Sequence, residues 1–424
     1  MNQPTVFPSR AQLVHPLSAA TCGDLLRRRW TRVASGTGWT PTARLGIALA
    51  ALRDWLSQRL GMPGYERSGL GLILLCCALL AGCCPRSNQT LSGLPLVRCE
   101  FEAVEMAIPF RIVAYAPNWF VASNAAHAAF ARISDLNRSL SDYDAESELS
   151  HLSLTAGSGI AIPLSADLAT VLLRARDFSA ASGGAFDVTV GPLTQLWRRA
   201  RRQHELPDPE RLTQALEAVG WTNLILTRTL ADADLSSRRS PSTVALSYTA
   251  RLNKPKMRLD LGAIAKGYAL DEAARVLRQH GLTRTLVTGA GDMVAGDPPP
   301  GESGWKIDLA PLDLADAPPG LSVRLKNGSL CTSGDLFQHV EIGGVRYSHI
   351  VDPHTGLGMT DHSLVIAIGP DGITTDALST TLSVVGPERG LPIARQFRSE
   401  ARMIRAPGGQ IEISATRGFP RPSR

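Results

Sequence analysis

Residues 259–271 read Leu-Asp-Leu-Gly-Ala-Ile-Ala-Lys-Gly-Tyr-Ala-Leu-Asp, and the predicted architecture is arranged around them. The apolar start is typical of a strand end, and after Gly262 small and apolar residues recur at helical spacing. A turn of small residues entering a helix exposes backbone N–H groups and the positive end of the helix dipole, so it can bind a phosphate. Lys266 adds a positive charge one turn into the helix, and Asp260 offers a carboxylate before it. Alone, this pattern is weak evidence because such turns are common and lysines near helix starts are usually solvated.

The charge of the chain is concentrated at its front end. At 424 residues the chain can hold one large domain or two to three ordinary ones. Its formal net charge is +6. Residues 1–61 hold eight arginines and two aspartates, so they account for the whole of that charge and the rest sums to zero. A neutral remainder gives no support for a nucleic-acid partner.

A short apolar run near residue 80 predicts a lipoprotein signal. Residues 70–82 are uncharged and apolar, too few for a bilayer span of about 20 residues but typical of a signal-peptide h-region. Arg67 precedes the run as the positive n-region, and Leu80-Ala81-Gly82-Cys83 resembles the bacterial lipobox. The Cys83 of such a motif is acylated and becomes the mature N-terminus. The alternative is a buried or membrane helix with a chance cysteine.

This signal divides the front of the chain. Residues 1–61 are an incorrectly assigned start or an atypical cytoplasmic leader, 62–82 form the signal peptide, and 83–98 form a flexible tether. We therefore expect a lipid-anchored protein of a bacterial inner or outer membrane that faces the periplasm. The cysteines after Cys83 have no paired spacing, so neither a disulfide framework nor a zinc site is indicated.

The chain after the tether mixes predicted strands and helices. Gly183-Gly184 ends one helix, which allows a positive φ or a close approach to a ligand. The basic run Arg198–Arg202 is interpreted as a solvated helix face, and residues 227–256 as an extended hairpin or surface insertion. The predicted elements are a strand pair over 101–115, helices over about 118–136, 165–182 and 207–219, strands over 221–226, 285–288, 330–335 and 364–368, and a threonine-capped helix over 374–385.

The last predicted helix carries a metal-type pair. Asp376 and Thr380 are four residues apart, so their side chains share one helix face. A carboxylate and a hydroxyl form a sparse, hard oxygen site that suits Mg²⁺ sharing its other positions with water and phosphate. The alternative is a capping aspartate and a buried threonine that bonds back to the helix.

Six segments, in this order, resemble the ApbE family, the FAD:protein FMN transferases, which are often membrane lipoproteins. The resemblance covers about residues 99–400. The segments are Ser147-Glu148-Leu149, residues 183–193 (GGAFDVTVGPL), residues 259–271, Thr332-Ser333-Gly334-Asp335, residues 347–356 (YSHIVDPHTG) and residues 376–380 (DALST).

The resemblance implies a two-lobed α+β single domain over 99–405, with FAD bound between the lobes, followed by a C-terminal tail over 406–424. It implies Mg²⁺-dependent cleavage of the FAD pyrophosphate, in which FMN passes to a threonine or serine hydroxyl of a membrane redox protein and AMP leaves. Residues implied to contact FAD are Met106, Tyr143, Ala185, Phe186, Asp187, Asp260, Lys266 and Ile350. The residues implied to hold the metal are Ala263, through its backbone carbonyl, Asp376 and Thr380.

The chemistry assigns roles to these residue types. Attack on a diphosphate builds negative charge on oxygen, which a metal and Lys266 would stabilise. The attacking hydroxyl must lose its proton, and His349, with an ordinary pKa near 6.5, is the candidate general base. Asp352 either orients His349 or caps the following turn. Tyr143 or Phe186 stacks on an aromatic ring of FAD, or else either one belongs to the core.

Two departures from the family pattern stand near these residues. Met106-Ala107-Ile108 replaces the usual Met-Gly-Thr, and Gly289-Ala290-Gly291-Asp292 replaces a plain double glycine. Two other functions remain open. An FAD pyrophosphatase would use water in place of the protein hydroxyl, and a non-catalytic lipoprotein would only bind flavin.

Overall fold

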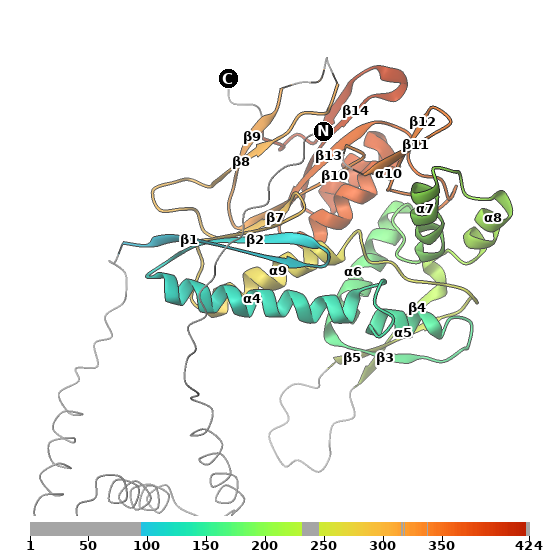
Figure 1. Ribbon diagram of the computed structural model, residues 1–424, viewed down its shortest axis with the longest axis horizontal. Coiled ribbons are helices and arrows are strands. Elements are labelled where there is room, and N and C mark those ends of the chain that lie inside the picture. Colours follow the sequence, from blue (N-terminus) through green and yellow to red (C-terminus); the bar gives the residue numbers. More distant parts are fainter. Residues whose placement is uncertain (1–94, 231–245, 315–316, 318, 337, 421–424) are drawn as a thin grey trace, which may run out of the picture. The chain divides into compact units, whose positions relative to one another are not determined.

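An eight-stranded antiparallel sheet forms the centre of the computed structural model, which describes residues 95–230, 246–314, 317, 319–336 and 338–420 (Figure 1). Hydrogen-bonded neighbours follow the order β1-β2-β6-β7-β10-β13-β14-β15. The strands are β1 (Val97–Glu105), β2 (Ile108–Ala116), β6 (Thr285–Gly289), β7 (Asp292–Ala295), β10 (Gly328–Gly334), β13 (Ser363–Gly369), β14 (Glu400–Arg405) and β15 (Glu412–Ala415).

Three helices cover one face of this sheet (Figure 1). They are α4 (Trp119–Leu140), α9 (Ala265–Gln279) and α10 (Gly372–Gln396). Their inward faces carry alanine and leucine at helical spacing, which lets the helices pack closely on the sheet and on each other. On the other face lies a separate hairpin of β8 (Trp305–Leu309) and β9 (Leu321–Leu325), with its own apolar cluster.

A second, smaller group of elements lies beside the sheet. Its three-stranded sheet has the order β3-β5-β4, and α7 and α8 pack near the hairpin of β11 and β12 through a third apolar cluster. The elements are α5 (Glu148–Leu154), β3 (Ile162–Leu164), α6 (Ala166–Ser182), α7 (Gly191–Gln203), α8 (Pro209–Glu217), the 3₁₀ turn Trp221–Asn223, β4 (Leu224–Leu230), β5 (Leu246–Leu252), β11 (His339–Ile342), β12 (Val345–Ser348) and the 3₁₀ turn Pro407–Gly409.

The mixed architecture confirms the α+β prediction, and most predicted elements occur with small shifts of their ends. Ser147 caps α5, and Gly183 ends α6 with a positive φ of 64°. The cap of α10 was predicted wrongly, because the side chain of Asp371, not a threonine, accepts the hydrogen bond from the Thr374 N–H.

Two boundaries also differ from the prediction. The segment 406–424 is not a mere tail, because β15 within it pairs with β14 and Phe419 is buried against the sheet. At the other end, β1 begins at Val97, two residues inside the predicted tether.

The predicted strand end at Leu259–Leu261 does not form. Leu259 donates its N–H to the Ser153 hydroxyl and Asp260 donates to the Val188 carbonyl, but the neighbouring segment turns into α7 after Val190. The β-type pairing between these two segments is therefore limited to a single bridge between Val190 and Arg258. The segment is extended but belongs to no sheet.

Several predictions concern residues outside the described ranges. They include the 1–61 extension, the 62–82 signal peptide, Cys83, nearly all of the tether, and residues 231–245 of the predicted insertion. Within the described ranges, no helix has the length and apolar character needed to cross a bilayer.

Candidate active site

The start of α9 lies against the start of α10 because two glycines meet there. A Cβ on Gly267 would lie 2.1 Å from the Gly372 carbonyl oxygen, so neither position has room for a side chain. Asp271, one turn further along α9, accepts hydrogen bonds from the N–H groups of Gly372 and Ile373 at 2.7 and 2.8 Å. These contacts fix the N-terminus of α10 against α9, so that Lys266 faces Asp376.

Lys266 lies between two buried carboxylates. Its Nζ is 2.9 Å from Asp376 Oδ1 and 3.3 Å from Asp292 Oδ2. Burial raises the pKa of Asp292 to about 6, although the Lys266 charge opposes this. For Lys266, burial works against the charged form, but Asp376 and Asp292 raise its pKa above the ordinary range. With both carboxylates ionised, the centre holds one more negative charge than positive.

The backbone next to this centre leaves a carbonyl oxygen without its helical partner. In a regular helix the Gly267 N–H would donate to the Ala263 carbonyl. Here it donates to Asp376 Oδ2 at 2.9 Å. Among the described residues no hydrogen bond reaches the Ala263 carbonyl oxygen, and this residue lies at the pocket wall. The freed carbonyl supports the predicted backbone ligand.

Thr380 completes a set of oxygen donors. It is partly exposed on the face of α10 that carries buried Asp376, and its Oγ1 is 3.3 Å from the Ser333 hydroxyl. In the described part of the chain, no three His, Cys, Asp or Glu side chains gather as a metal cluster. The donors here are instead carboxylates with a hydroxyl and a carbonyl. Hard oxygens of this kind fit Mg²⁺, which keeps several positions for water or phosphate.

These groups open onto a pocket of about 730 Å³ between the sheet with its helices and the smaller group of elements. Its volume is within the usual range for small-molecule sites. Asp376 lies behind the wall, in contact with Lys266. The predicted site residues that line the pocket are Met106, Tyr143, Ala185, Phe186, Asp187, Asp260, Ala263, Lys266, His349, Ile350 and Thr380.

His349 enters the pocket as a neutral base. Its Nδ1 is 3.0 Å from the Gln338 carbonyl oxygen, which can only accept a hydrogen bond, so Nδ1 carries the proton and Nε2 keeps a lone pair. Burial, with the charges of Arg201 and Lys266, lowers the pKa of His349 to about 4. The ring is therefore uncharged at neutral pH and able to take a proton.

Asp352 does not contact His349. Its carboxylate accepts hydrogen bonds from the His354 N–H at 2.9 Å and from the Thr355 hydroxyl at 3.2 Å. This is the geometry of a turn cap, the second of the two predicted alternatives, and the Gln338 carbonyl orients the imidazole instead. Asp352 is also absent from the pocket wall.

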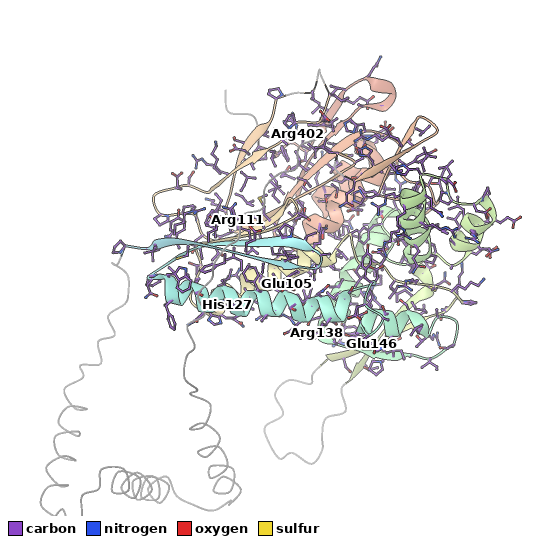
Figure 2. The ribbon with its side chains drawn as sticks, in the orientation of Figure 1. Glu105, Arg111, His127, Arg138, Glu146 and Arg402 are labelled. Atoms are coloured by element: carbon purple, nitrogen blue, oxygen red, sulfur yellow. The ribbon has the colours of Figure 1, made fainter. Side chains whose placement is uncertain are left out.

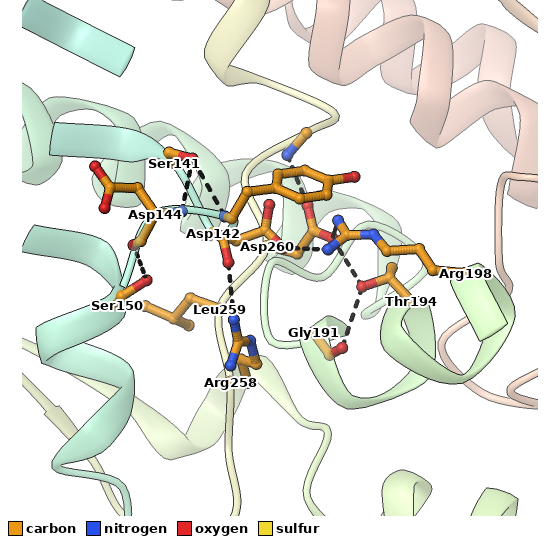
Figure 3. Close-up of polar contacts among 12 residues, drawn as sticks. Ser141, Asp142, Asp144, Ser150, Gly191, Thr194, Arg198, Arg258, Leu259 and Asp260 are labelled. Atoms are coloured by element: carbon orange, nitrogen blue, oxygen red, sulfur yellow. Dashed lines mark hydrogen bonds and ion pairs between the residues drawn. The ribbon is translucent and has the colours of Figure 1, made fainter. Parts of the chain in front are cut away.

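Arg198 joins three segments at the wall (Figure 3). Its guanidinium contacts Asp142 at 2.5 Å and Asp260 at 2.8 Å, and Asp260 also accepts from Thr194 and from the Gly262 N–H. The predicted solvated face is therefore wrong for Arg198, whose side chain is only 19% exposed. The network fixes Asp260 just before the turn that leads to Lys266.

The two candidate aromatic residues differ in their surroundings. Tyr143 is 78% exposed, and its ring centroid lies 4.1 Å from the Arg198 guanidinium carbon. Phe186 is buried and packs on Phe178, with ring centroids 5.7 Å apart. Tyr143 is therefore available to a ligand ring, whereas Phe186 belongs mainly to the core. Asp187 is likewise engaged, because it accepts from Thr189 and from the Trp221 N–H.

Asp292 and Arg198 belong to the site although the sequence did not predict them there. Asp292 lies 26 positions from Lys266 and reaches it because β6 and β7 form a tight hairpin beside α9. Its only signal in the sequence was its place at the end of a glycine turn. Arg198 had no signal beyond the basic run, since its partners lie 56 and 62 residues away.

The fold and the site define an α+β protein with a pocket between two groups of elements and a charged centre suited to phosphate chemistry. Comparison with known proteins is consistent with this class. The model of the ApbE family matches residues 106–404. The chain belongs to the ApbE family and is a transferase of that family.

Several relatives are similar over most of their length. The FAD:protein FMN transferase of Haemophilus influenzae is 30% identical over 268 residues, which cover 62% of this chain and 73% of the relative. That of Treponema pallidum is 30% identical over 279 residues, covering 64% and 74%. The solved flavin transferase ApbE from Vibrio cholerae superposes with a TM-score of 0.64 at 25% identity, covering 77% of this chain and 99% of that chain.

Proposed function

We propose that this chain transfers the FMN part of FAD to a serine or threonine hydroxyl of an acceptor protein and releases AMP. The names of its relatives support flavin transfer. The pocket supports it chemically, because Lys266, Asp292 and the neutral imidazole of His349 line one cavity of suitable size, and Asp376 contacts Lys266 from behind the pocket wall. The product is a phosphoester between FMN and the acceptor residue.

The charge imbalance around Lys266 carries this proposal. Two carboxylates with a single ammonium repel a bare diphosphate, so an anionic substrate requires an added cation at this centre. The Ala263 carbonyl, Asp376 and Thr380 are the residues that would hold Mg²⁺. Bound there, Mg²⁺ would neutralise the phosphate charge that develops during transfer. Lys266 supplies a second positive charge to the same oxygens.

The pocket residues account for the remaining steps. His349 Nε2 accepts the proton of the acceptor hydroxyl while the hydroxyl oxygen forms a bond to the FMN phosphorus. The bond from that phosphorus to the bridging oxygen breaks, and AMP leaves with the electron pair. Tyr143, held by Arg198, offers an exposed ring for stacking on an aromatic part of FAD.

One assay separates transfer from hydrolysis and from simple binding. The chain is mixed with FAD, Mg²⁺ and an acceptor protein bearing a Ser/Thr-Gly-Ala-Thr-type site. Transfer gives AMP and an acceptor whose mass increases by that of bound FMN. Release of AMP and free FMN with an unlabelled acceptor would identify a pyrophosphatase instead. FAD binding without release of AMP would indicate a non-catalytic flavin-binding protein. Asp352→Asn is the matched control, since that carboxylate lies outside the pocket.

We also propose that the chain is anchored by lipid at Cys83 in a bacterial inner or outer membrane and faces the periplasm, where a membrane redox subunit would be the acceptor. The apolar run and Leu80-Ala81-Gly82-Cys83 support this. Incorporation of labelled palmitate that is lost in Cys83→Ser tests it. Equal labelling of both proteins, or of neither, would contradict the anchor.

A further inference from the structure

One corner of the folded unit exposes four apolar side chains. At the start of β1, Leu96 is 36% exposed and Val97 is 49% exposed. At the start of α4, Trp119 is 63% exposed and Phe120 is 69% exposed. Large aromatic side chains left this open on a soluble surface usually mark a contact with another molecule or a membrane.

These four residues stand at the neighbouring starts of β1 and α4, and we call them the apolar corner. Val97 pairs with Ala116 across the β1–β2 hairpin, and α4 begins shortly after Ala116. Alternation along β1 places Val97 on the same face as Phe101, whose ring centroid is 6.2 Å from that of Trp119. The aromatic residues of α4 outside the core are thus gathered next to the first residues of the described chain.

The apolar character is confined to this end of the helix. Farther along α4, exposed positions carry His127 and Arg138 (Figure 2). Glu105 lies at the opposite end of β1 (Figure 2). A local cluster of tryptophan, phenylalanine, leucine and valine at the rim of a polar surface is the composition that enters the interface of a bilayer.

The short link between the apolar corner and Cys83 indicates that the corner contacts a membrane. Leu96 follows Cys83 by thirteen residues, a length that spans at most about 45 Å when extended. A lipid on Cys83 therefore keeps the adjoining corner within reach of the bilayer surface. We propose that the apolar corner inserts into the membrane that holds the anchor, as a second attachment point. This rests on the lipid anchor proposed above.

The attachment would set the position of the pocket. Met106 lines the pocket in the turn after β1, at the opposite end of the hairpin from Val97. Nine strand residues span about 30 Å. The inserted corner would therefore hold the pocket at about this distance along the hairpin from the membrane, suited to acceptor residues in a domain above the bilayer.

Tryptophan fluorescence tests the insertion directly. The full chain is placed in phosphatidylcholine vesicles whose acyl chains carry bromine, which quenches tryptophan at short range. We expect the wild-type emission to be quenched and Trp119→Phe to lose that quenching. Trp305→Phe, which removes a buried tryptophan elsewhere, should keep it. Adding Phe120→Trp to the Trp119→Phe protein should restore it.

Other outcomes would overturn the proposal. Equal quenching in wild type and Trp119→Phe would show that Trp119 does not reach the acyl chains, which would overturn the insertion. A chain that crosslinks as a dimer in the same vesicles, with Trp119 shielded from aqueous iodide but not quenched by bromine, would assign the corner to a second copy. Palmitate labelling distinguishes this proposal from the lipid anchor. If Trp119 is quenched but Cys83 is not acylated, the anchor is refuted while the insertion of the apolar corner is supported.

Discussion

Two buried aspartates in this molecule have pKa values shifted in opposite directions. Asp292 is 2% exposed and Asp335 is 1% exposed. Burial raises the pKa of Asp292 to about 6. Burial also opposes ionisation of Asp335, but the Ser363 N–H, His362 and Arg346 hold its pKa below the ordinary range.

The difference lies in the number of partners. Asp335 accepts from the Ser363 N–H at 2.8 Å and contacts His362 and Arg346 at 2.9 and 2.5 Å, so one carboxylate has two basic side chains. Asp292 shares a single ammonium with Asp376. A carboxylate with enough partners fixes structure, in this case the β11–β12 hairpin before His349. A carboxylate that lacks a full partner is available to a cation.

Removing Asp376 should have the largest effect. Asp376→Ala deletes the proposed charged metal ligand, so we expect flavin transfer with Mg²⁺ to fall by at least about 10²-fold. Initial rates of AMP release measure this. Unchanged Mg²⁺-dependent turnover would refute the metal assignment.

Removing Asp335 should affect stability more than chemistry. Asp335→Ala leaves the partly buried Arg346 without its counter-charge and His362 Nδ1 without its hydrogen-bond partner, a change that costs about 3 kcal/mol. Denaturant unfolding measures the loss. If unfolding is unchanged while transfer is abolished, Asp335 belongs to the chemistry and the contrast between the two aspartates fails.

Neutralising Asp292 should separate stability from metal binding. In Asp292→Asn, Asp376 is the carboxylate that remains beside Lys266 at this centre. The Lys266 ammonium then competes with the metal for Asp376, so we expect metal affinity to weaken about 10- to 100-fold. The free energy of unfolding should change by less than about 1 kcal/mol, because a repelling buried charge is removed. A large loss of stability with unchanged metal affinity would give Asp292 the same role as Asp335.

The smallest expected effect concerns pH. His349 acts as a base only when neutral, and its lowered pKa keeps it neutral down to about 4. Protonation of His349 should therefore lower kcat/KM only as pH drops through about 4, and it should cause no decrease near pH 6.5. Profiles of wild type and His349→Gln check this, and a wild-type limb near 6.5 that His349→Gln removes would show that the pocket does not perturb the imidazole.

The sequence predicted local features well. The i, i+4 pair of Asp376 and Thr380 lies on one helix as expected, and the glycine that ends α6 has the expected positive φ. Residues predicted to contact the flavin line one pocket, because ordered family motifs were carried over position by position.

Contacts between distant segments could not be predicted. The pairing of Lys266 with Asp292 depends on how the β6–β7 hairpin lies beside α9, and Arg198 reaches Asp142 and Asp260 only after α7 docks. The β15 strand was missed for the same reason, since a short edge strand is defined by its partner β14 rather than by its own composition.

The central claim, that the centre with excess negative charge binds a divalent cation at the flavin pocket, is tested most directly by titrating Mn²⁺ into the protein and measuring free Mn²⁺ by electron paramagnetic resonance. We expect saturable binding in wild type and in Asp352→Asn, and loss of that binding in Asp376→Ala. Equal binding in all three proteins would contradict the account.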